Sequence, residues 1–522
     1  MGTYVNPGTK NFEKDINDDF YVDKSMLIKV LNTKINRRNC YCCVSRPRRF
    51  GKTMAANMIA AYYSKGCDSH ELFSDLKISK DPSFEENVNK YTVIQLDMND
   101  VVTNKEDRSV TEYINKEVVY ELRKVYPSAL PEENVSLSKA IKEIYSSTGD
   151  QFVFVIDEYD VIIRDQKYSS ELDGYLTFLV SLFKNSATAP AIALAYLTGI
   201  MPIIKEKTQS KLNNFTEYTM IDPDEMAPFM GFTEDEVKSL ATQSGMEFDE
   251  LKKWYDGYNL RGLEIYSPKS VISSVEKKRC DDYWVETSSY EAVTDYISLD
   301  FEGLKEDVIS MFAGNRVAVR TSFYRNTMSF ETKYDVLTYL IHLGYLAYDA
   351  DTSSCFIPNN EIKDMWALSM ERAKGYKDVF QMIKDSKKLL ESTWNGDEEA
   401  VARGVAKAHR EACSILEYNN EGSFQSAIHL AYYYAKSYYT IVNELPAGKG
   451  FADCAFIPYK PDVPAIIIEL KKDDTVENAI DQIKNRKYPE ALEKYKDNLL
   501  LVAISYDSKT KEHFSRIEKA VI

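Results

Sequence analysis

Short apolar segments alternate with helix-forming segments through the first 220 residues or so. Four of these segments predict buried strands, at residues 40–45, 92–100, 151–160 and 191–199. Stretches rich in helix formers lie between them, beginning with MAANMIAAYYSKG at residues 54–66. Strands that are apolar throughout and separated by helices favour a parallel sheet covered on both faces. We therefore predict one α/β domain here.

The pattern changes in the middle of the chain. Residues 231–245 predict a helix in which Thr233 and Glu236 form a capping box and Gly245 is the stop. A helix at 334–345 followed by a small hairpin at 346–358 suggests a winged-helix-like module, and we expect mostly helix from 376 to 420.

The last hundred residues alternate between strand and helix patterns again. Strands are expected at residues 448–459 and 464–472, a helix at 477–495, and a last strand at 498–506. This order predicts a second α/β unit at roughly 420–522.

Composition narrows the class of protein. The net charge of −16 argues against a protein that coats nucleic acid nonspecifically, which would usually be basic. No apolar run reaches 18 residues and the start lacks an apolar signal core, so we expect no membrane span and a cytoplasmic location. Of the eight cysteines, only Cys40 and Cys43 have C-x-x-C spacing, and no second such motif exists to pair with it, so we expect no zinc site.

Residues 45–53, SRPRRFGKT, end like a phosphate-binding loop. The pattern G-x-x-x-x-G-K-[ST] asks for glycine at position 46, where this chain has Arg46. Lys52 would reach the β- and γ-phosphates and Thr53 would hold Mg²⁺. Pro47 lacks an N–H, so the cradle would be built from the amides of residues 49–53. The tripeptide GKT alone fits a chance match in a helix-opening loop about equally well.

Acidic residues at the end of the third strand favour the nucleotide site. Asp157 is suited to the Mg²⁺ shell, and Glu158 to polarising the attacking water. The alternative is a solvated strand end. Thr198, at the end of the fourth strand, is placed where it could sense the γ-phosphate. Together these residues predict a hydrolytic site.

A series of ordered motifs resembles the AAA-ATPase-like family of bacterial and archaeal proteins, in which R-P-R-R-F-G-K-T is the phosphate loop. They are YVDKSMLI (21–28), RPRRFGKT (46–53), VFVIDEYD (153–160), LTGI (197–200), KLNNF (211–215), GFTEDEV (231–237), WYDGY (254–258), YSPKSVI (266–272) and YWVETSS (283–289).

The resemblance implies an AAA/STAND-like P-loop domain with ATP and Mg²⁺ as ligands. The nucleotide contacts predicted on this basis are Arg48, Arg49, Phe50, Gly51, Lys52, Thr53, Met54 and Thr198. Arg48 or Arg49 either acts on the γ-phosphate or forms a basic rim that attracts it. Tyr21 and Asp23 are weaker candidates for the adenine side.

A second acidic set lies near the end of the chain. Asp453 in one expected strand and Glu469 with Lys471 in the next could hold Mg²⁺ and assist phosphodiester cleavage. Glu469 and Lys471 are two residues apart and so share a strand face. The alternative is an exposed cross-strand ion pair.

Three segments resemble the PD-(D/E)XK nuclease superfamily: NELPAGKGFAD (443–453), IIIELK (466–471) and AIDQIKNRKY (479–488). The resemblance implies catalytic roles for Asp453, Glu469 and Lys471, with the two carboxylates as metal ligands. It also places Gln482 and Tyr488 on the following helix. Glu421 is a candidate helix carboxylate, and Glu444 a weaker one.

We expect four regions: a P-loop ATPase-like domain (1–220), its helical lid (221–295), a helical or winged-helix-like middle (296–419) and a nuclease-like domain (420–522). The favoured hypothesis is an ATPase that controls a Mg²⁺-dependent nuclease acting on DNA or RNA. An ATP-driven signalling or assembly switch, in which the nuclease-like domain binds without cutting, remains the alternative. A nucleotide kinase fits less well, because the middle and the tail would have no role. A homo-oligomer is compatible with either hypothesis.

Overall fold

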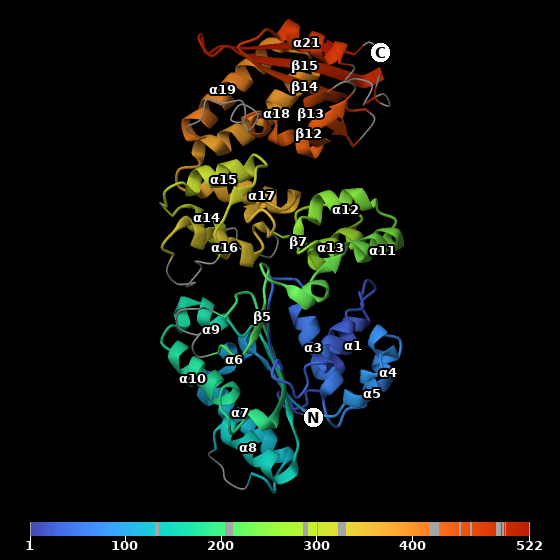
Figure 1. Cartoon of the computed structure of the whole chain (residues 1–522), viewed down its shortest axis with the longest axis vertical. Helices are drawn as coiled ribbons and strands as arrows, with labels where there is room; N and C mark the ends of the chain where they lie inside the picture. Colours follow the sequence, from blue (N-terminus) through green and yellow to red (C-terminus); the bar gives the residue numbers. More distant parts are fainter. Residues whose placement is uncertain are drawn as a thin grey trace. The chain divides into compact units, whose positions relative to one another are not determined.

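The computed structural model describes residues 2–520 except 131–134, 204–211, 285–290, 300, 322–329, 417–426, 448–449, 460–461, 487–491, 493–494 and 496 (Figure 1). The chain forms two compact units. The N-terminal unit comprises Met1–Ser288 and Ala318–Ile362, and the C-terminal unit comprises Ser289–Val317 and Lys363–Ile522.

A five-stranded parallel sheet forms the core of the N-terminal unit, in the order β2-β3-β4-β1-β5. Its strands are β1 (Tyr41–Ser45), β2 (Thr92–Asp97), β3 (Phe152–Asp157), β4 (Ile192–Gly199) and β5 (Thr216–Tyr218). The first four confirm the strands expected from the apolar runs. The three-residue strand β5 is too short to give a sequence pattern of its own.

Both faces of this sheet are covered, as its apolar strands require (Figure 1). Alternate residues of β3 point to opposite sides. Phe154 and Ile156 pack in the core under α7 (Val110–Val125), α8 (Leu137–Thr148) and α10 (Leu172–Phe183). Val153 and Val155 pack in the core that contains α3 (Lys52–Tyr63). The cysteines Cys40, Cys42 and Cys43 are buried in these cores.

The helices of this part of the chain are α1 (Lys10–Ile16), α2 (Met26–Asn32), α3 (Lys52–Tyr63), α4 (His70–Phe73), α5 (Ser83–Asn87), α6 (Met98–Asn104), α7 (Val110–Val125), α8 (Leu137–Thr148), α9 (Val161–Arg164) and α10 (Leu172–Phe183). Short 3₁₀ turns occur at η1 (Lys77–Lys80), η2 (Gln166–Tyr168), η3 (Ala189–Ala191) and η4 (Asp224–Phe229).

A helical layer with a small sheet follows. It contains β6 (Phe232–Thr233), α11 (Glu234–Ser244), α12 (Phe248–Tyr255), β7 (Tyr258–Leu260), β8 (Leu263–Tyr266) and α13 (Pro268–Lys277). The expected capping box is present: the Glu236 carboxylate accepts a hydrogen bond from the Thr233 amide at 2.8 Å. Gly245 ends α11 with φ +70°.

The helix and hairpin predicted at 334–358 are also present. They are α16 (Lys333–Leu343), β10 (Ala347–Asp349) and β11 (Ser354–Phe356). Two elements cross the boundary between the units, β9 (Val317–Ala318) and α17 (Asn360–Arg372). The four regions expected from the sequence end at residues 220, 295 and 419, whereas the two compact units meet at 288/289, 317/318 and 362/363. The boundaries of the four regions stay a prediction.

The C-terminal unit is built on a five-stranded mixed sheet in the order β12-β13-β14-β15-β16. Its strands are β12 (Tyr439–Ala447), β13 (Gly450–Pro458), β14 (Ala465–Lys472), β15 (Leu499–Tyr506) and β16 (His513–Lys519). Its helical elements are α14 (Glu291–Ile297), α15 (Leu304–Phe312), α18 (Lys377–Trp394), α19 (Glu398–Leu416), η6 (Tyr433–Ser437) and α21 (Val476–Asn485).

One strand expectation was wrong here. The segment at 498–506 is not the last strand, because β16 pairs with β15 along seven residues. The sequence HFSRIEK has only two apolar residues, Phe514 and Ile517, among several charges, as suits a partly exposed edge strand. Within the part of the chain that the structure describes, no helix is both long and apolar enough to span a bilayer.

Candidate functional sites

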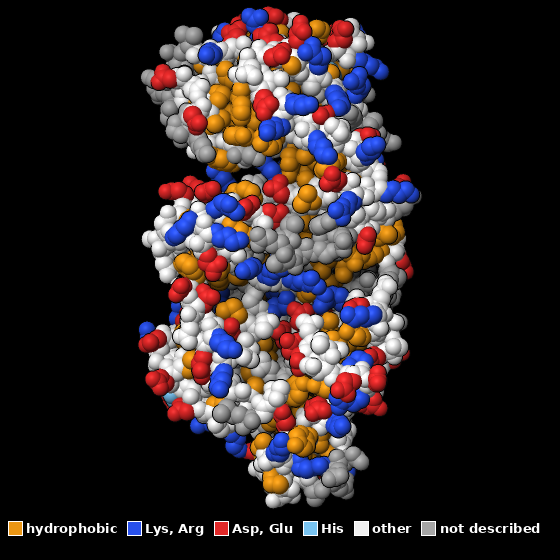
Figure 2. Space-filling view, turned by 180° about the vertical axis from the view of Figure 1, so that it is seen from behind, with side chains coloured by type: hydrophobic (Ala, Val, Ile, Leu, Met, Phe, Trp, Pro, Cys, Tyr) orange, Lys and Arg blue, Asp and Glu red, His pale blue; other side chains and the backbone are white. Residues whose placement is uncertain are grey.

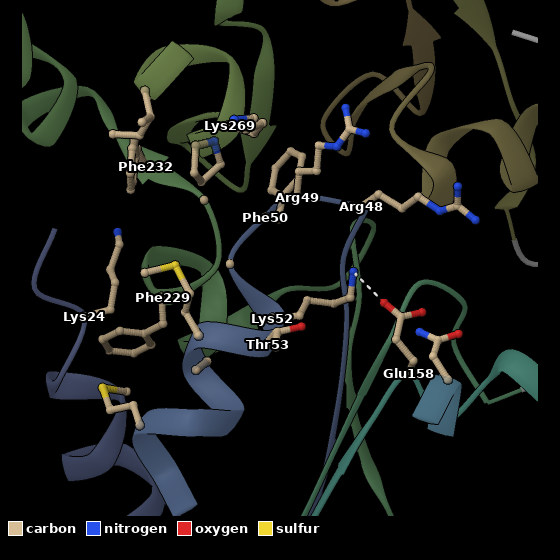
Figure 3. A pocket seen from close by; sticks show the side chains of 18 of the residues that line it. Lys24, Arg48, Arg49, Phe50, Lys52, Thr53, Glu158, Phe229, Phe232 and Lys269 are labelled. Atoms are coloured by element: carbon tan, nitrogen blue, oxygen red, sulfur yellow. Dashed lines mark ion pairs between the residues drawn. The ribbon is translucent and has the colours of Figure 1, made fainter. Parts of the chain in front are cut away.

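The carboxyl ends of β1, β3 and β4 meet at one edge of the parallel sheet, where ligands bind in open α/β folds. A cavity of about 800 Å³ opens there. Its lining includes most of the residues predicted for the nucleotide: Arg48, Arg49, Phe50, Gly51, Lys52, Thr53, Met54 and Glu158. Figure 3 shows the side chains of Arg48, Arg49, Phe50, Lys52, Thr53 and Glu158 around the cavity.

The loop after β1 takes a helix-opening conformation. Gly51 has φ +84° at the N-cap of α3, and Arg49 has φ +69°. The free amides at the start of a helix attract anions, so this geometry suits a phosphate. Lys52 is 5% exposed, and its Nζ donates to the Pro47 carbonyl at 3.0 Å. That Nζ also lies 3.5 Å from Glu158 Oε1 (Figure 3).

Thr53 and Asp157 are brought together as the Mg²⁺ prediction requires. The Thr53 hydroxyl donates to Asp157 Oδ2 at 2.6 Å. Burial raises the pKa of Asp157 to about 6, while the hydrogen bond from Thr53 opposes that rise. A hard cation prefers a carboxylate and a hydroxyl at such spacing, with phosphate and water oxygens completing its shell. These two residues therefore fit Mg²⁺, which would neutralise phosphate charge there.

Glu158 turns out of β3 with an unusual backbone. Its φ is +51°, in the left-handed region that non-glycine residues seldom occupy. Its carboxylate contacts Lys52 on one oxygen and Arg164 NH2, at 3.1 Å, on the other. Strain of this kind is maintained where the surrounding structure holds the residue for a task.

Arg46 occupies the position of the missing glycine without facing the cavity. Its side chain is fully buried, and NH1 donates to the carbonyls of Ser45 (2.8 Å) and Tyr218 (3.0 Å). Burial lowers its pKa to about 10. Arg46 thus ties the loop to β5, so its side chain has a structural contact where glycine would have none.

The other loop residues differ in exposure. Arg48 is exposed, whereas Arg49 is half-buried and donates to the Trp284 carbonyl at 3.3 Å. Phe50 is buried, with its ring edge-on to Tyr258. Met54 is 41% exposed at the cavity. Whether Arg48 or Arg49 acts on the γ-phosphate stays a prediction.

Thr198 is the predicted contact that the cavity does not include. It is fully buried, and its hydroxyl donates to the Val44 carbonyl at 3.0 Å. This bond joins β4 to β1 and directs the hydroxyl into the sheet. Its proposed contact with the γ-phosphate has no support in this conformation.

An aromatic wall lines the far side of the cavity. It includes Tyr21, whose contact with adenine stays a prediction, and four aromatic residues that the sequence reasoning missed, Phe12, Phe20, Phe229 and Phe232, with the apolar Ile272 beside them. Asp23 does not line the cavity; its oxygens accept from the amides of Ser25 and Lys77. The aromatic residues come from distant segments, so no local motif could have joined them.

In the C-terminal unit, strand register brings the second acidic set together. Cys454 pairs with Ile468, so Asp453 stands opposite Glu469 on the neighbouring strand, on the sheet face that α21 covers. Glu469 Oε1 accepts from Lys471 Nζ at 3.0 Å and from Gln482 Nε2 on α21. Asp453 Oδ2 accepts from the Leu470 amide at 2.7 Å.

The second oxygen of Glu469 marks this site as incomplete. Glu469 is 1% exposed, and its Oε2 has no hydrogen-bond partner among the residues that the structure describes. Burial raises the pKa of Glu469, with the Asp453 charge adding to the rise. A buried carboxylate oxygen without a donor is costly and suits a cation. Asp453 and Glu469 therefore fit a divalent metal.

The weaker candidates around this site fare differently. Glu444 stands opposite Asp453 in the β12–β13 pairing, with φ +49°. Glu421 and Tyr488 lie outside the described residues. No group of three or more His, Cys, Asp and Glu side chains in the described ranges could hold a metal alone. Either metal shell would need oxygens from a substrate or from water.

Comparisons with known proteins match a different family model to the part of the chain that holds each site. Residues 6–208 match the family described as "Predicted AAA-ATPase", AAA-ATPase-like, and residues 419–515 match the PD-(D/E)XK nuclease superfamily. A curated relative, an uncharacterized protein in the vnfD 5' region of Azotobacter chroococcum mcd 1, is 24% identical over 305 residues. The match covers 56% of this chain and 55% of the relative, so the chain spans about half the length of that protein.

Two solved structures are also similar. The ORC2 protein of Aeropyrum pernix, in ADPNP–ADP complexes, is 9% identical with a TM-score of 0.24, covering 67% of this chain and 94% of that one. AMPPCP-bound DnaA from Aquifex aeolicus is 10% identical with a TM-score of 0.24, covering 70% and 86%. The assignment of the domains therefore rests on the two family matches. The chain has an AAA-ATPase-like domain at residues 6–208 and a PD-(D/E)XK nuclease-superfamily domain at residues 419–515.

Proposed function

We propose that this protein hydrolyses ATP at the edge of its parallel sheet and that ATP controls metal-dependent cleavage of DNA or RNA by its C-terminal domain. The observation that supports the first half is that Lys52, Thr53 and Glu158 line one cavity, while the buried Asp157 accepts a hydrogen bond from Thr53 beside it.

Each of these side chains has a task in hydrolysis. Lys52 binds the β- and γ-phosphates, while Thr53 and Asp157 hold Mg²⁺. Glu158 accepts a proton from the attacking water as the oxygen–phosphorus bond forms and the bond to the ADP oxygen breaks. The aromatic wall that contains Tyr21 and Phe232 takes the base. Aromatic and apolar surface of this kind is typical of ligand cavities.

The C-terminal half of the proposal rests on Asp453, Glu469 and Lys471. The two carboxylates would hold a divalent cation, and the chemistry that the cation would supply is activation of water and neutralisation of phosphate charge. Lys471 stabilises negative charge on the scissile phosphate, and Gln482 orients Glu469 through its hydrogen bond. Figure 2 shows several Lys and Arg side chains among acidic ones on the C-terminal unit, at the top of that view. They offer local positive charge in a chain of net charge −16.

Two variants test the two halves separately. Lys52→Ala should abolish tight ATP binding, measured by titration calorimetry. Lys65→Ala is the matched control, because that lysine follows α3 and pairs instead with Asp150. Tight binding by Lys52→Ala would overturn the phosphate-loop assignment.

For the nuclease, single- and double-stranded DNA and RNA are incubated with Mg²⁺ or Mn²⁺, with and without ATP. Glu469→Ala should lose cleavage, whereas Glu477→Ala, an exposed acid at the start of α21, should keep it. Cleavage by Glu469→Ala at the wild-type rate would show that the site is wrong. Nucleotide-dependent assembly without cleavage under any metal would favour the switch.

A further inference from the structure

Arg164 is the second cation that contacts Glu158 in the nucleotide cavity, and no sequence motif assigns it a role. It ends the short helix α9 and lines the cavity, with a side chain only 16% exposed. Its NH2 donates to Glu158 Oε2 at 3.1 Å. Glu158 therefore stands between two cations, since its other oxygen lies 3.5 Å from Lys52 Nζ.

A buried carboxylate anchors this arginine. Arg164 Nε lies 3.3 Å from Asp160 Oδ2, and Asp160 is fully buried. The same oxygen accepts from the amides of Ile200 (3.3 Å) and Met201 (2.9 Å), just beyond β4. Asp160 leaves no room at Gly199, where a Cβ would come within 2.4 Å of its Oδ1. This ion pair holds the guanidinium beside the end of β4, without a hydrogen bond from Nε among the described residues.

The two cations beside Glu158 are not equivalent when a triphosphate binds. Lys52 has a flexible stem and a point charge that the phosphates would attract, which weakens its contact with Glu158. Arg164 has a planar group already fixed by Asp160, so it keeps its geometry. The left-handed backbone of Glu158 fixes the near end of the same ion pair.

We propose that Arg164 is a positioning residue for ATP hydrolysis. It holds Oε2 of Glu158, so that Oε1 faces the attacking water once Lys52 turns to the phosphates. This inference rests on the proposed ATPase and deepens it. The reaction is the hydrolysis proposed above, in which the proton of water passes to Glu158, and ADP and phosphate leave.

The first test separates binding from turnover. Arg164→Ala should bind ATP within about threefold of wild type and lower the single-turnover hydrolysis rate about 10- to 100-fold, the range for loss of a charged hydrogen bond. Arg164→Lys, which keeps the charge but not the fork, should recover part of that rate. Lys238→Ala, which removes an exposed cation paired with Glu234 on α11, should behave as wild type.

A double-mutant cycle shows whether Arg164 acts through Glu158. Arg164→Ala added to Glu158→Gln should lower the rate no further, because the group that it positions is already lost. Added guanidinium ion should raise the rate of Arg164→Ala but not that of Glu158→Gln. Additive losses, or equal losses of binding and turnover, would overturn the positioning role. If wild type hydrolyses no ATP, the proposed function itself fails, which is a different result.

Discussion

The two candidate sites hold their acidic residues in different ways. Asp157 and Glu158 are adjacent in sequence at the end of a parallel strand, and each has a partner: Thr53 for Asp157, and Lys52 with Arg164 for Glu158. Asp453 and Glu469 are far apart in sequence and meet through antiparallel register. One oxygen of Glu469 has no partner in the described part of the chain.

The two sites therefore differ in what compensates their buried negative charge. The nucleotide site compensates its own charges, so a ligand replaces contacts that already exist. At the nuclease-like site a buried oxygen has no donor among the residues that the structure describes, so a cation would supply a missing contact. The first site should fold well without its ligand, and the second should be stabilised by a metal.

The largest expected effects come from replacing the carboxylate that acts on water at the ATP site and the carboxylate that would hold a metal at the nuclease-like site. Glu158→Gln should lower ATP hydrolysis about 100- to 10,000-fold while ATP binding is kept, because the carboxylate acts on water and not on the nucleotide. Glu469→Gln should abolish cleavage and leave ATP hydrolysis unchanged. Phosphate release and gel assays measure the two activities. A loss of ATP hydrolysis in Glu469→Gln would mean that the sites are not separable.

A second buried glutamate, Glu361, also has one oxygen, Oε2, without a hydrogen-bond partner among the described residues, but no sequence motif assigns it to a metal site. Glu361 accepts from the amides of Tyr283 and Trp284 at 2.9 Å, and burial raises its pKa to about 8. The protonated form is the one that the fold favours. The contribution of protonated Glu361 to the free energy of unfolding is therefore complete below about pH 4.5 and is lost as the pH rises towards 8.

Glu361→Gln should consequently gain Tm over wild type as the pH is raised from 5 to 8, by an amount worth a few kcal/mol at most. Thermal unfolding at a series of pH values measures this. A Tm difference that stays constant with pH would show that the Glu361 carboxyl is not held protonated.

Metal binding should distinguish the two buried glutamates. Without nucleotide, Mn²⁺ should raise the Tm of wild type and of Glu361→Gln, since a ligand at 100 times its Kd stabilises by about 2.7 kcal/mol. Glu469→Gln should lose most of that increase. Equal increases in all three proteins would place the metal elsewhere.

The smallest effect concerns the packing behind the phosphate loop. Gly344, at the end of α16, has φ +83°, and a Cβ there would come within 2.8 Å of the Pro47 side chain. Gly66 has a similar φ of +85° with nothing near its Cβ position. Gly344→Ala should therefore lower the free energy of unfolding by about 1–2 kcal/mol more than Gly66→Ala. Urea unfolding measures the difference, and equal losses would show that Pro47 can move aside.

The sequence predicted much of the nucleotide site because its parts are local. Four apolar strands, a helix-opening loop and an acidic strand end leave clear patterns at Lys52, Thr53, Asp157 and Glu158. Arg164 was missed although it lies six residues after Glu158, because only the fold shows that α9 turns its guanidinium back to that carboxylate. The burial of Arg46 likewise depends on β5, which is too short to predict.

The nuclease-like site was predictable only in part. Spacing placed Glu469 and Lys471 on one strand face, but the register that sets Asp453 opposite Glu469 is a tertiary property. With only Phe514 and Ile517 apolar, β16 has no apolar run that would predict it. The burial of Thr198 depends on its hydrogen bond to Val44 on the neighbouring strand, which is also a tertiary property. Sequence patterns report the local backbone, whereas burial and partners come from packing.

The central claim is that one chain couples an ATP site to a metal-dependent nuclease. The most direct measurement is cleavage of labelled DNA and RNA in Mn²⁺ by wild type, Glu158→Gln and Glu469→Gln, each with ATP and without nucleotide. We expect wild type to cleave at a rate that depends on ATP, Glu158→Gln to change that dependence, and Glu469→Gln not to cleave. Cleavage that is indifferent to ATP and to both substitutions would contradict it.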